Sequence, residues 1–287
     1  MPINITGSFK FKRSKKTRPA PLLPNDRALL RQIQQEQSRK KQEMDSVVRL
    51  ENTGPAKVEW EKVQFPQDIN SLLGEITRRM WTDFPENFSH GRARTISDAR
   101  QQVPPFIMTS HLYGIFAHNI TLVDRTIAAC QKTGKLHVLN VEIPGVNELV
   151  ITAENFSHPL KEVMKTKFDR TWFPGSDLRQ FDLPKLVADG YLTTAIDKPG
   201  VYTISIPRQG AFIKLVLDGR QWLRKTLEAT KWKELPEPQL LDRLERSTKF
   251  WKDFKGFSLE WILYDAVGCG IVEPFGTPIG RGWKLVG

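Results

Sequence analysis

The sequence predicts an α+β protein that is mostly helical, because one order of elements recurs three times along it. In each case a helix is followed by two short strands joined by a turn, over 121–152, 182–206 and 258–286. A helix that feeds a β-hairpin is typical of the winged helix, in which the hairpin is the wing. Three occurrences, each with glycine after the helix, predict three tandem winged-helix domains packed together. Their spacing is too irregular for a solenoid.

The first predicted domain covers residues 67–155. Apolar residues recur at helical spacing between Ile69 and Met80 and predict its first helix. Residues 84–104 hold two prolines and a glycine and are expected to form a loop. A second helix is expected near 106–117.

The third helix of this domain precedes its hairpin. Thr121 and Asp124 resemble a capping box at the start of the helix, and Gly134 is placed to end it. The strands of the hairpin are predicted at 136–142 and 149–152.

The second and third predicted domains, 156–207 and 208–287, repeat this order. Asp182 is placed to cap a helix that ends before Gly190, and Ser258 is the candidate cap in the third domain. The strands are predicted at 191–196, 201–206, 271–275 and 283–286, with turns at 197–200 and 276–282.

Two further segments precede these domains. Residues 1–24 are expected to be a disordered basic tail, since the first 18 residues hold six cations, no acidic residue and little apolar surface. The run KFKRSKKTR suits a nuclear-import signal or a nucleic-acid-binding arm, and a solvated tail explains it equally well. Residues 25–66 are expected to form a charged helix followed by a linker.

The charge, the apolar runs and the cysteines of the sequence limit the kinds of molecule that the protein can bind and the compartments that it suits. The formal net charge of +11 favours an anionic partner, such as nucleic acid, an acidic protein surface or an anionic membrane. The sequence has no apolar run near the ~20 residues of a membrane span, so no membrane partner is expected. Cys130 and Cys269 make neither a zinc-ligand pattern nor a disulfide framework, which fits the nucleus or the cytosol.

The stretch 208–233 is the strongest candidate for an interaction site. It holds seven cations and two acidic residues, and its charge of +5 together with the +6 of the tail accounts for the whole excess. Phe212, Val216, Leu223 and Leu227 predict the apolar face of a long helix, with the cations on its flanks and solvent side. Such cations suit phosphate contacts, although an exposed lysine-rich helix kept soluble by its charges is the plain alternative. The candidate DNA-binding residues here are Arg208, Lys214, Arg220, Arg224, Lys225, Lys231 and Lys233.

Weaker candidates lie outside this stretch or are aromatic. Arg125 flanks the predicted recognition helix of the first domain, and Arg281 lies in the third wing. Trp222 and Trp232 can stack on bases, but core packing suits Trp222 better.

Catalysis finds little support in the sequence. We find no glycine-rich phosphate loop, and no set of kinase motifs can be assembled. The five histidines are scattered and make no metal-ligand pattern. We therefore expect no catalytic residue, no metal and no cofactor.

Several ordered motifs over about 84–287 resemble the serine/threonine-protein kinase 19 family. They are VPPFIMTSHLYG at 103–114, DRTIAACQKTGKL at 124–136, LVADGYLT at 186–193, IPRQGAFIKLVLDGRQ at 206–221 and TKWKEL at 230–235. Despite its name, the family is expected to have three winged helices and no kinase fold.

The resemblance implies a nuclear protein that binds double-stranded DNA in transcription-coupled nucleotide-excision repair. It implies three protein partners: the RNA polymerase II elongation complex, the Cockayne-syndrome A ligase subunit and TFIIH. Among the DNA-binding positions of the family, Lys214, Arg220, Lys231 and Lys233 carry over. Ala211 stands where the family carries an arginine, and Arg208 is the nearest replacement.

Three functions remain open at this point. The first is a non-catalytic DNA-binding repair factor, and the second is a winged-helix scaffold that binds proteins without contacting DNA. The third, a protein kinase, rests on the family name alone. DNA or RNA preference and a homodimer are left open.

Overall fold

A computed structural model describes residues 31–32, 34–36, 38–39, 50, 69–141, 143, 145, 148–166, 172–195 and 198–286. The chain divides into two units, Met1–Val48 and Arg49–Gly287. The predicted basic tail lies outside the described residues, and so does most of the predicted segment 25–66. The positions described between 31 and 39 are helical.

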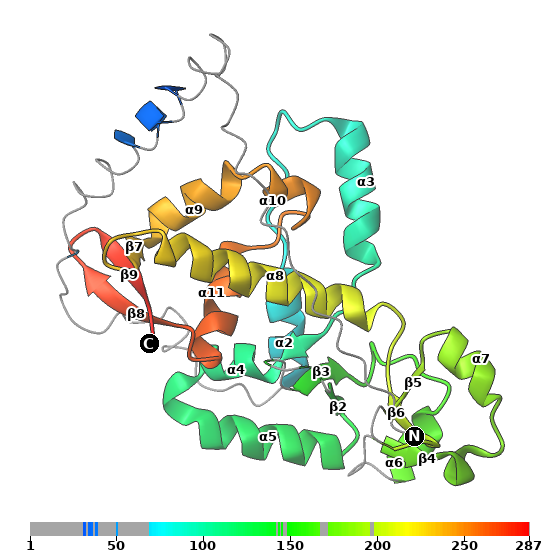
Figure 1. Cartoon of the computed structure of the whole chain (residues 1–287). Helices are drawn as coiled ribbons and strands as arrows, with labels where there is room; N and C mark the ends of the chain where they lie inside the picture. The colour runs from blue at the N-terminus through cyan, green and yellow to red at the C-terminus, as the bar shows by residue number, and fades with distance from the viewer. Residues whose placement is uncertain are drawn as a thin grey trace, which may run out of the picture. The chain divides into compact units, whose positions relative to one another are not determined.

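The described part of the second unit is α+β and largely helical, as predicted, with three three-stranded antiparallel sheets (Figure 1). We call the segments that carry these sheets the first module (69–152), the second module (161–204) and the third module (209–285). Each sheet consists of the two strands of a hairpin and one strand from earlier in the chain. The earlier strand pairs with the second strand of the hairpin.

The first module holds its hairpin after a series of short helices, and its sheet has the order β1-β3-β2. Its elements are α2 (Ile69–Arg78), α3 (His90–Gln101), β1 (Ile107–Met108), α4 (Thr109–Ile115), η2 (Ala117–Asn119), α5 (Ile120–Lys132), β2 (Leu136–Asn140) and β3 (Glu148–Thr152).

The second module is the smallest of the three, and its sheet has the order β4-β6-β5. Its elements are α6 (Lys161–Thr166), β4 (Trp172–Pro174), η3 (Gly175–Leu178), α7 (Leu183–Ala188), β5 (Leu192–Thr194) and β6 (Val201–Ile204).

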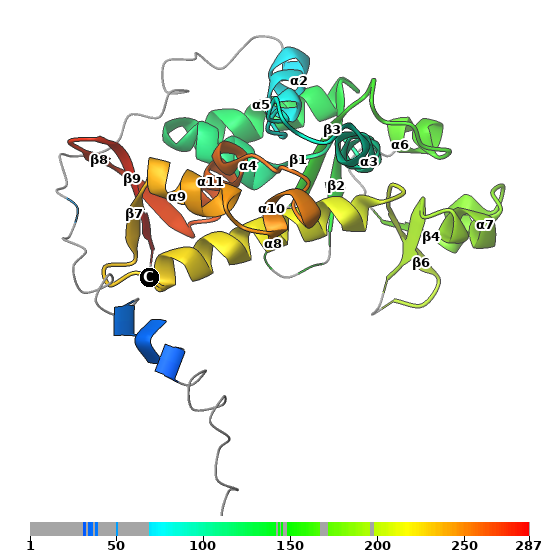
Figure 2. The ribbon, with the colours of Figure 1, turned by 90° about the horizontal axis from the view of Figure 1, so that it is seen from above.

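The third module begins with α8, the longest helix in the described part of the chain, which runs from the second module to β7 (Figure 2). Its sheet has the order β7-β9-β8. Its elements are α8 (Gln209–Glu228), β7 (Glu234–Pro236), α9 (Glu237–Glu245), α10 (Lys249–Lys252), α11 (Leu259–Gly268), β8 (Val272–Thr277) and β9 (Gly280–Leu285).

Local signals in the sequence placed the hairpins correctly. The Asp182 side chain accepts a hydrogen bond from the Lys185 backbone N–H at 3.2 Å, which confirms the predicted cap. Gly134 and Gly190 have φ of +71° and +82° just after their helices, the conformation for which glycine is favoured at a helix end.

Three local predictions were wrong. Residues 90–101 of the expected loop form α3, although only Ile96 of that helix is buried. The helix α5 begins at Ile120, after Asn119, so Thr121 does not cap it. The third turn is much tighter than 276–282, because β8 and β9 pair as far as Thr277 and Gly280. Among the residues described, no helix is long and apolar enough to cross a lipid bilayer.

The first and third modules share one core, because α4 and α11 cross without any room for a side chain between them. A Cβ on Gly114 would lie 1.8 Å from the Tyr264 carbonyl oxygen. A Cβ on Gly268 would lie 1.6 Å from the Ser110 carbonyl oxygen. The two backbones therefore touch, which only glycine permits at these positions.

His111 is buried beside this crossing. Its ring centroid lies 4.1 Å from that of Trp261. Burial lowers the pKa of His111 to about 4, although the charge of Asp265 and a backbone hydrogen bond at Trp261 oppose the shift. The histidine is therefore neutral in the folded protein at neutral pH.

This buried histidine predicts that the protein loses stability in mild acid. Its folded-state pKa lies below the 6.5 of an unperturbed histidine. Between these values the unfolded chain binds a proton that the folded chain does not, so stability is complete above pH 6.5 and falls towards about pH 4. The loss from this group reaches about 3 kcal/mol.

The measurement is urea unfolding at about pH 7.5 and about pH 5 for wild type and His111→Phe. Burial also lowers the pKa of His158, so wild type has a second contribution of the same sign. The difference between the two proteins isolates His111. Equal pH dependence in both would contradict the prediction.

Candidate nucleic-acid interface

The predicted basic helix is present as α8, and its apolar face is the one expected. Phe212, Val216, Leu223 and Leu227 are all buried. Lys214, Arg224 and Lys225 are exposed on the remaining surface of the helix. The helix therefore has one side in the core and presents cations on the other.

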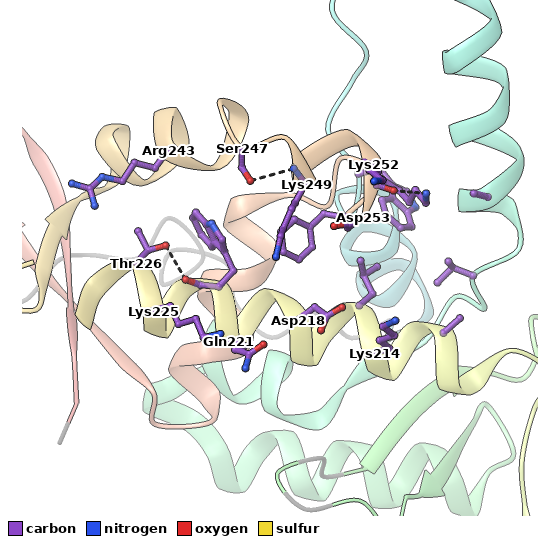
Figure 3. A pocket seen from close by; sticks show the side chains of 18 of the residues that line it. Lys214, Asp218, Gln221, Lys225, Thr226, Arg243, Ser247, Lys249, Lys252 and Asp253 are labelled. Carbon is purple, nitrogen blue, oxygen red and sulfur yellow. Dashed lines mark hydrogen bonds between the residues drawn. The ribbon is translucent and has the colours of Figure 1, made fainter. Parts of the chain in front are cut away.

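A groove with a volume of about 950 Å³ lies beside α8 (Figure 3). Lys214 and Lys225 lie on its α8 wall, and the facing wall comes from α9, α10 and the segment up to 255. Its lining holds six cations against two acidic residues: Lys214, Lys225, Arg243, Lys249, Lys252 and Lys255 against Asp218 and Asp253. This excess of positive charge between two walls suits a polyanion.

Aromatic residues also line the groove, and we call this part of the lining its floor. Trp81, Trp222 and Phe254 line it. Trp222 packs partly buried against the core, and its carbonyl oxygen accepts a hydrogen bond of 2.8 Å from the Thr226 hydroxyl. Trp81 makes an antiparallel backbone bridge with Phe257.

Arg100 of α3 binds the backbone beside two residues of the groove lining, Trp81 and Lys255. Its guanidinium donates to the carbonyl oxygens of Lys255 at 2.7 Å and Thr82 at 2.8 Å. The same group lies 5.2 Å from the ring centroid of Trp81 and 4.5 Å from that of Phe84, within the range of cation–π contacts. Arg100 thus fixes the backbone that presents Lys255.

Arg220 is not on the solvent side of α8, so the prediction of its position was wrong. Its Nε donates to Asp265 Oδ2 at 2.6 Å and its Nη2 to Asp265 Oδ1 at 3.0 Å. The Ser110 hydroxyl donates to the same carboxylate at 2.6 Å, and Arg220 Nη1 also donates to the Gly145 carbonyl oxygen.

Only 6 % of Arg220 is exposed. Burial alone would lower its pKa, but the hydrogen bonds and the charge of Asp265 raise it above the ordinary value. Arg220 is therefore a charged core residue that joins α8 to α4 and α11, and its side chain is not presented to a phosphate.

The other predicted residues lie in different places. Arg224 is exposed on α8 outside the groove lining, and Arg208 is exposed at the N-terminus of that helix. Lys231 and Lys233 are exposed beyond its C-terminus, and Arg125 is exposed on α5. The groove lining thus brings together only two of the nine predicted residues, Lys214 and Lys225.

Arg281 forms an ion pair with Glu237. Its Nε lies 2.8 Å from Glu237 Oε2, and its side chain is 24 % exposed. The ion pair leaves this cation poorly placed to bind a second anion, so the structure gives little support for Arg281 as a contact residue.

Sequence reasoning missed the facing wall of the groove. Lys249, Lys252 and Lys255 follow Arg246 at intervals of three residues, and the segment 246–255 has a single acidic residue. This spacing was a visible signal. It could not show that the segment lies opposite α8, because that depends on tertiary packing.

The helices that precede the first and third hairpins, α5 and α11, expose different side chains to solvent. In α11, residues 261–266 are all buried, so the helix presents no cationic face. In α5, Ile120 is 47 % exposed and Leu122 43 % exposed, beside Arg125. In the described part of the chain, no group of three or more histidine, cysteine or acidic residues could hold a metal ion.

A comparison with models of protein families places the chain. A family model described as "Inactive serine-threonine protein kinase 19" matches residues 77–285. This range contains every residue that lines the groove. A search of curated proteins found no match.

Proposed function

Because the chain belongs to the inactive serine-threonine protein kinase 19 family, we propose that it is a non-catalytic nuclear protein that binds double-stranded DNA. The description of the family as inactive agrees with the absence of assembled kinase motifs from the sequence. DNA binding itself is our inference from the site.

The observation that carries the proposal is the charge of the groove. Its two walls bring six cations to one surface with only two acidic residues among them. Each lysine or arginine that neutralises a phosphate releases counterions, which is the main source of affinity for nucleic acid. The chain has an excess of positive charge and places part of that excess in one groove.

We interpret the three modules as winged helices, since each has a helix followed by a hairpin, and an earlier strand completes the sheet. The buried α11 leaves no exposed recognition helix in the third module. Contacts in that module therefore go to the sugar–phosphate backbone through the groove walls, and these contacts position the protein without specifying sequence.

The test is duplex binding against salt concentration for wild type and for Lys214→Glu/Lys225→Glu. Each lost phosphate contact lowers the slope of log K against log salt by about 0.9, so the double variant should lose about 2 from the slope and bind more weakly. Arg220 is unsuitable for this test, because its replacement would disturb the core.

A matched control reverses two cations outside the groove, in Arg246→Glu/Lys284→Glu. Both cations pair with an acidic neighbour, Arg246 with Asp242 at 2.7 Å and Lys284 with Glu273 at 2.6 Å. The net charge changes equally in both double variants. If both double variants lose the same affinity for DNA, the groove has no specific role and only the net charge matters. An affinity that does not depend on salt would contradict the proposal.

The biological role follows from the resemblance described above. We place the protein in transcription-coupled nucleotide-excision repair, with the RNA polymerase II elongation complex, the Cockayne-syndrome A ligase subunit and TFIIH as partners. Support comes from family membership together with the basic groove, and localisation of the tagged full chain to the nucleus is the first check.

A second candidate function is a protein-interaction scaffold. The apolar exposure of Ile120 and Leu122 favours it, because a helix that reads DNA would present cations there. Leu122→Asp should then lose TFIIH or RNA polymerase II in nuclease-treated extract while keeping its affinity for duplex DNA. Retention of both partners by the variant would count against this use of α5.

A further inference from the structure

The floor of the groove contains aromatic side chains, which are not needed to bind a phosphate backbone. Backbone phosphates need cations, and these lie on the walls. Between the walls, the partly exposed Trp81 and Trp222 provide aromatic surface and Val103 provides aliphatic surface, while the buried Phe254 and Leu215 lie behind them in the core. Aromatic side chains below a cationic rim are typical of sites that hold unpaired bases.

Hydrogen-bonding groups without positive charge also line the groove. Asp218 and Gln221 lie on the α8 wall, and Asp253 lies on the facing wall (Figure 3). A carboxylate accepts from the amino group of cytosine, and an amide both donates to and accepts from adenine. The lining therefore carries groups that can hydrogen-bond base edges as well as cations that can bind phosphates.

The length of the groove fits several nucleotides. Lys214 and Lys225 are eleven residues apart on one helix, which separates them by about 16 Å. The bases of a duplex are stacked and paired, so their faces cannot stack on the aromatic floor. The bases of a single strand can turn towards it.

We propose that this groove receives an unpaired strand of DNA, with phosphates on the two walls and bases on the aromatic floor. The inference rests on the proposed function, since it uses the same cations for the backbone. It adds a preference: the favoured ligand is a duplex that continues into a single-stranded flank.

Three fluorescently labelled ligands test this preference with the full chain. The first is a blunt duplex, and the second is the same duplex with a mixed-sequence flank of about ten nucleotides. The third carries an abasic flank of equal length and charge. We expect the base-containing flank to lower Kd about tenfold relative to the abasic flank, since stacking one or two bases supplies that factor.

Variants separate the walls from the floor. Lys214→Glu/Lys225→Glu should weaken binding of all three ligands, whereas Trp222→Leu should weaken only the base-containing flank. Because Trp222 packs against the core, Gln221→Ala provides a second, exposed variant that removes a possible contact to a base from the α8 wall and leaves the charge unchanged. Arg224→Gln, outside the groove lining on the same helix, should leave the ratio between the base-containing and abasic flanks unchanged.

The outcomes distinguish the two proposals. Equal affinity for base-containing and abasic flanks, with blunt-duplex binding that still needs Lys214 and Lys225, overturns the single-strand preference alone. Blunt-duplex binding that is independent of salt and of both lysines overturns the proposed function as well. Displacement of the flanked DNA by polyglutamate at lower concentration than by oligonucleotide would also overturn the preference, in favour of an acidic protein ligand.

Discussion

Replacing Asp265 with alanine is expected to lower the free energy of unfolding by about 3–5 kcal/mol, because it leaves the Arg220 guanidinium charged and buried without its partner. The side chains of Arg220 and Asp265 are only 7 % and 1 % exposed, so water cannot replace the lost carboxylate. Ser110 loses the acceptor of its 2.6 Å hydrogen bond at the same time. Thermal or urea unfolding followed by circular dichroism measures the loss.

The control is Arg224→Ala, one turn along the same helix at an exposed position, which should change stability by less than about 0.5 kcal/mol. A second control is Arg220→Met/Asp265→Leu, which removes both charges together. Replacing a buried pair by apolar residues is often neutral, so the double variant should be far more stable than Asp265→Ala. An Asp265→Ala protein that unfolds like wild type would contradict the structural role.

The same double variant decides how Arg220 acts. If Arg220 is a core residue, the folded double variant should bind duplex DNA with the affinity of wild type. If the folded double variant instead shows a clearly smaller slope of log K against log salt, Arg220 contacts DNA.

Gly268→Ala is expected to lower the free energy of unfolding by about 3 kcal/mol or more, because a single methyl group forces two helix backbones apart. The new Cβ would lie 1.6 Å from the Ser110 carbonyl oxygen and 2.9 Å from the Gly114 nitrogen. Both neighbours are backbone atoms, so no side-chain rotation can relieve the overlap. The midpoint of urea unfolding is the direct measurement.

Gly74→Ala is the matched control, because it makes the same substitution within a helix, at a position with nothing within 4 Å of the new Cβ. Alanine is the better helix former, so this variant should be more stable than wild type by roughly 0.5–1 kcal/mol. Opposite signs for the two glycines would support the close crossing, and similar small effects at both would argue against it.

The hairpins and α8 could be predicted from the sequence because their signals are local. Asp182 and Gly190 bracket one helix, and the apolar residues of α8 recur at helical spacing. The first strand of each sheet escaped prediction. β1, β4 and β7 are two or three residues long, too short for a period-2 pattern to be recognised.

The candidate site was predicted only in part, since half of it depends on contacts between distant residues. Nothing local in α8 distinguishes Arg220 from Arg224, one turn away. Arg220 is buried because Asp265, 45 residues later, lies beside it. The helix α3 was missed for a related reason: it buries little apolar surface, and Arg100 ties it to the rest of the chain through carbonyl oxygens and aromatic rings.

The glycine crossing of α4 and α11 also links the order of synthesis to the order of folding. Residues 109–115 leave the ribosome well before residues 259–268, which supply the surface that packs against them. The first module cannot complete its core as a nascent chain. A truncation that removes residues 259–268 therefore removes one wall of the core of the first module, although the two segments lie about 150 residues apart in the sequence.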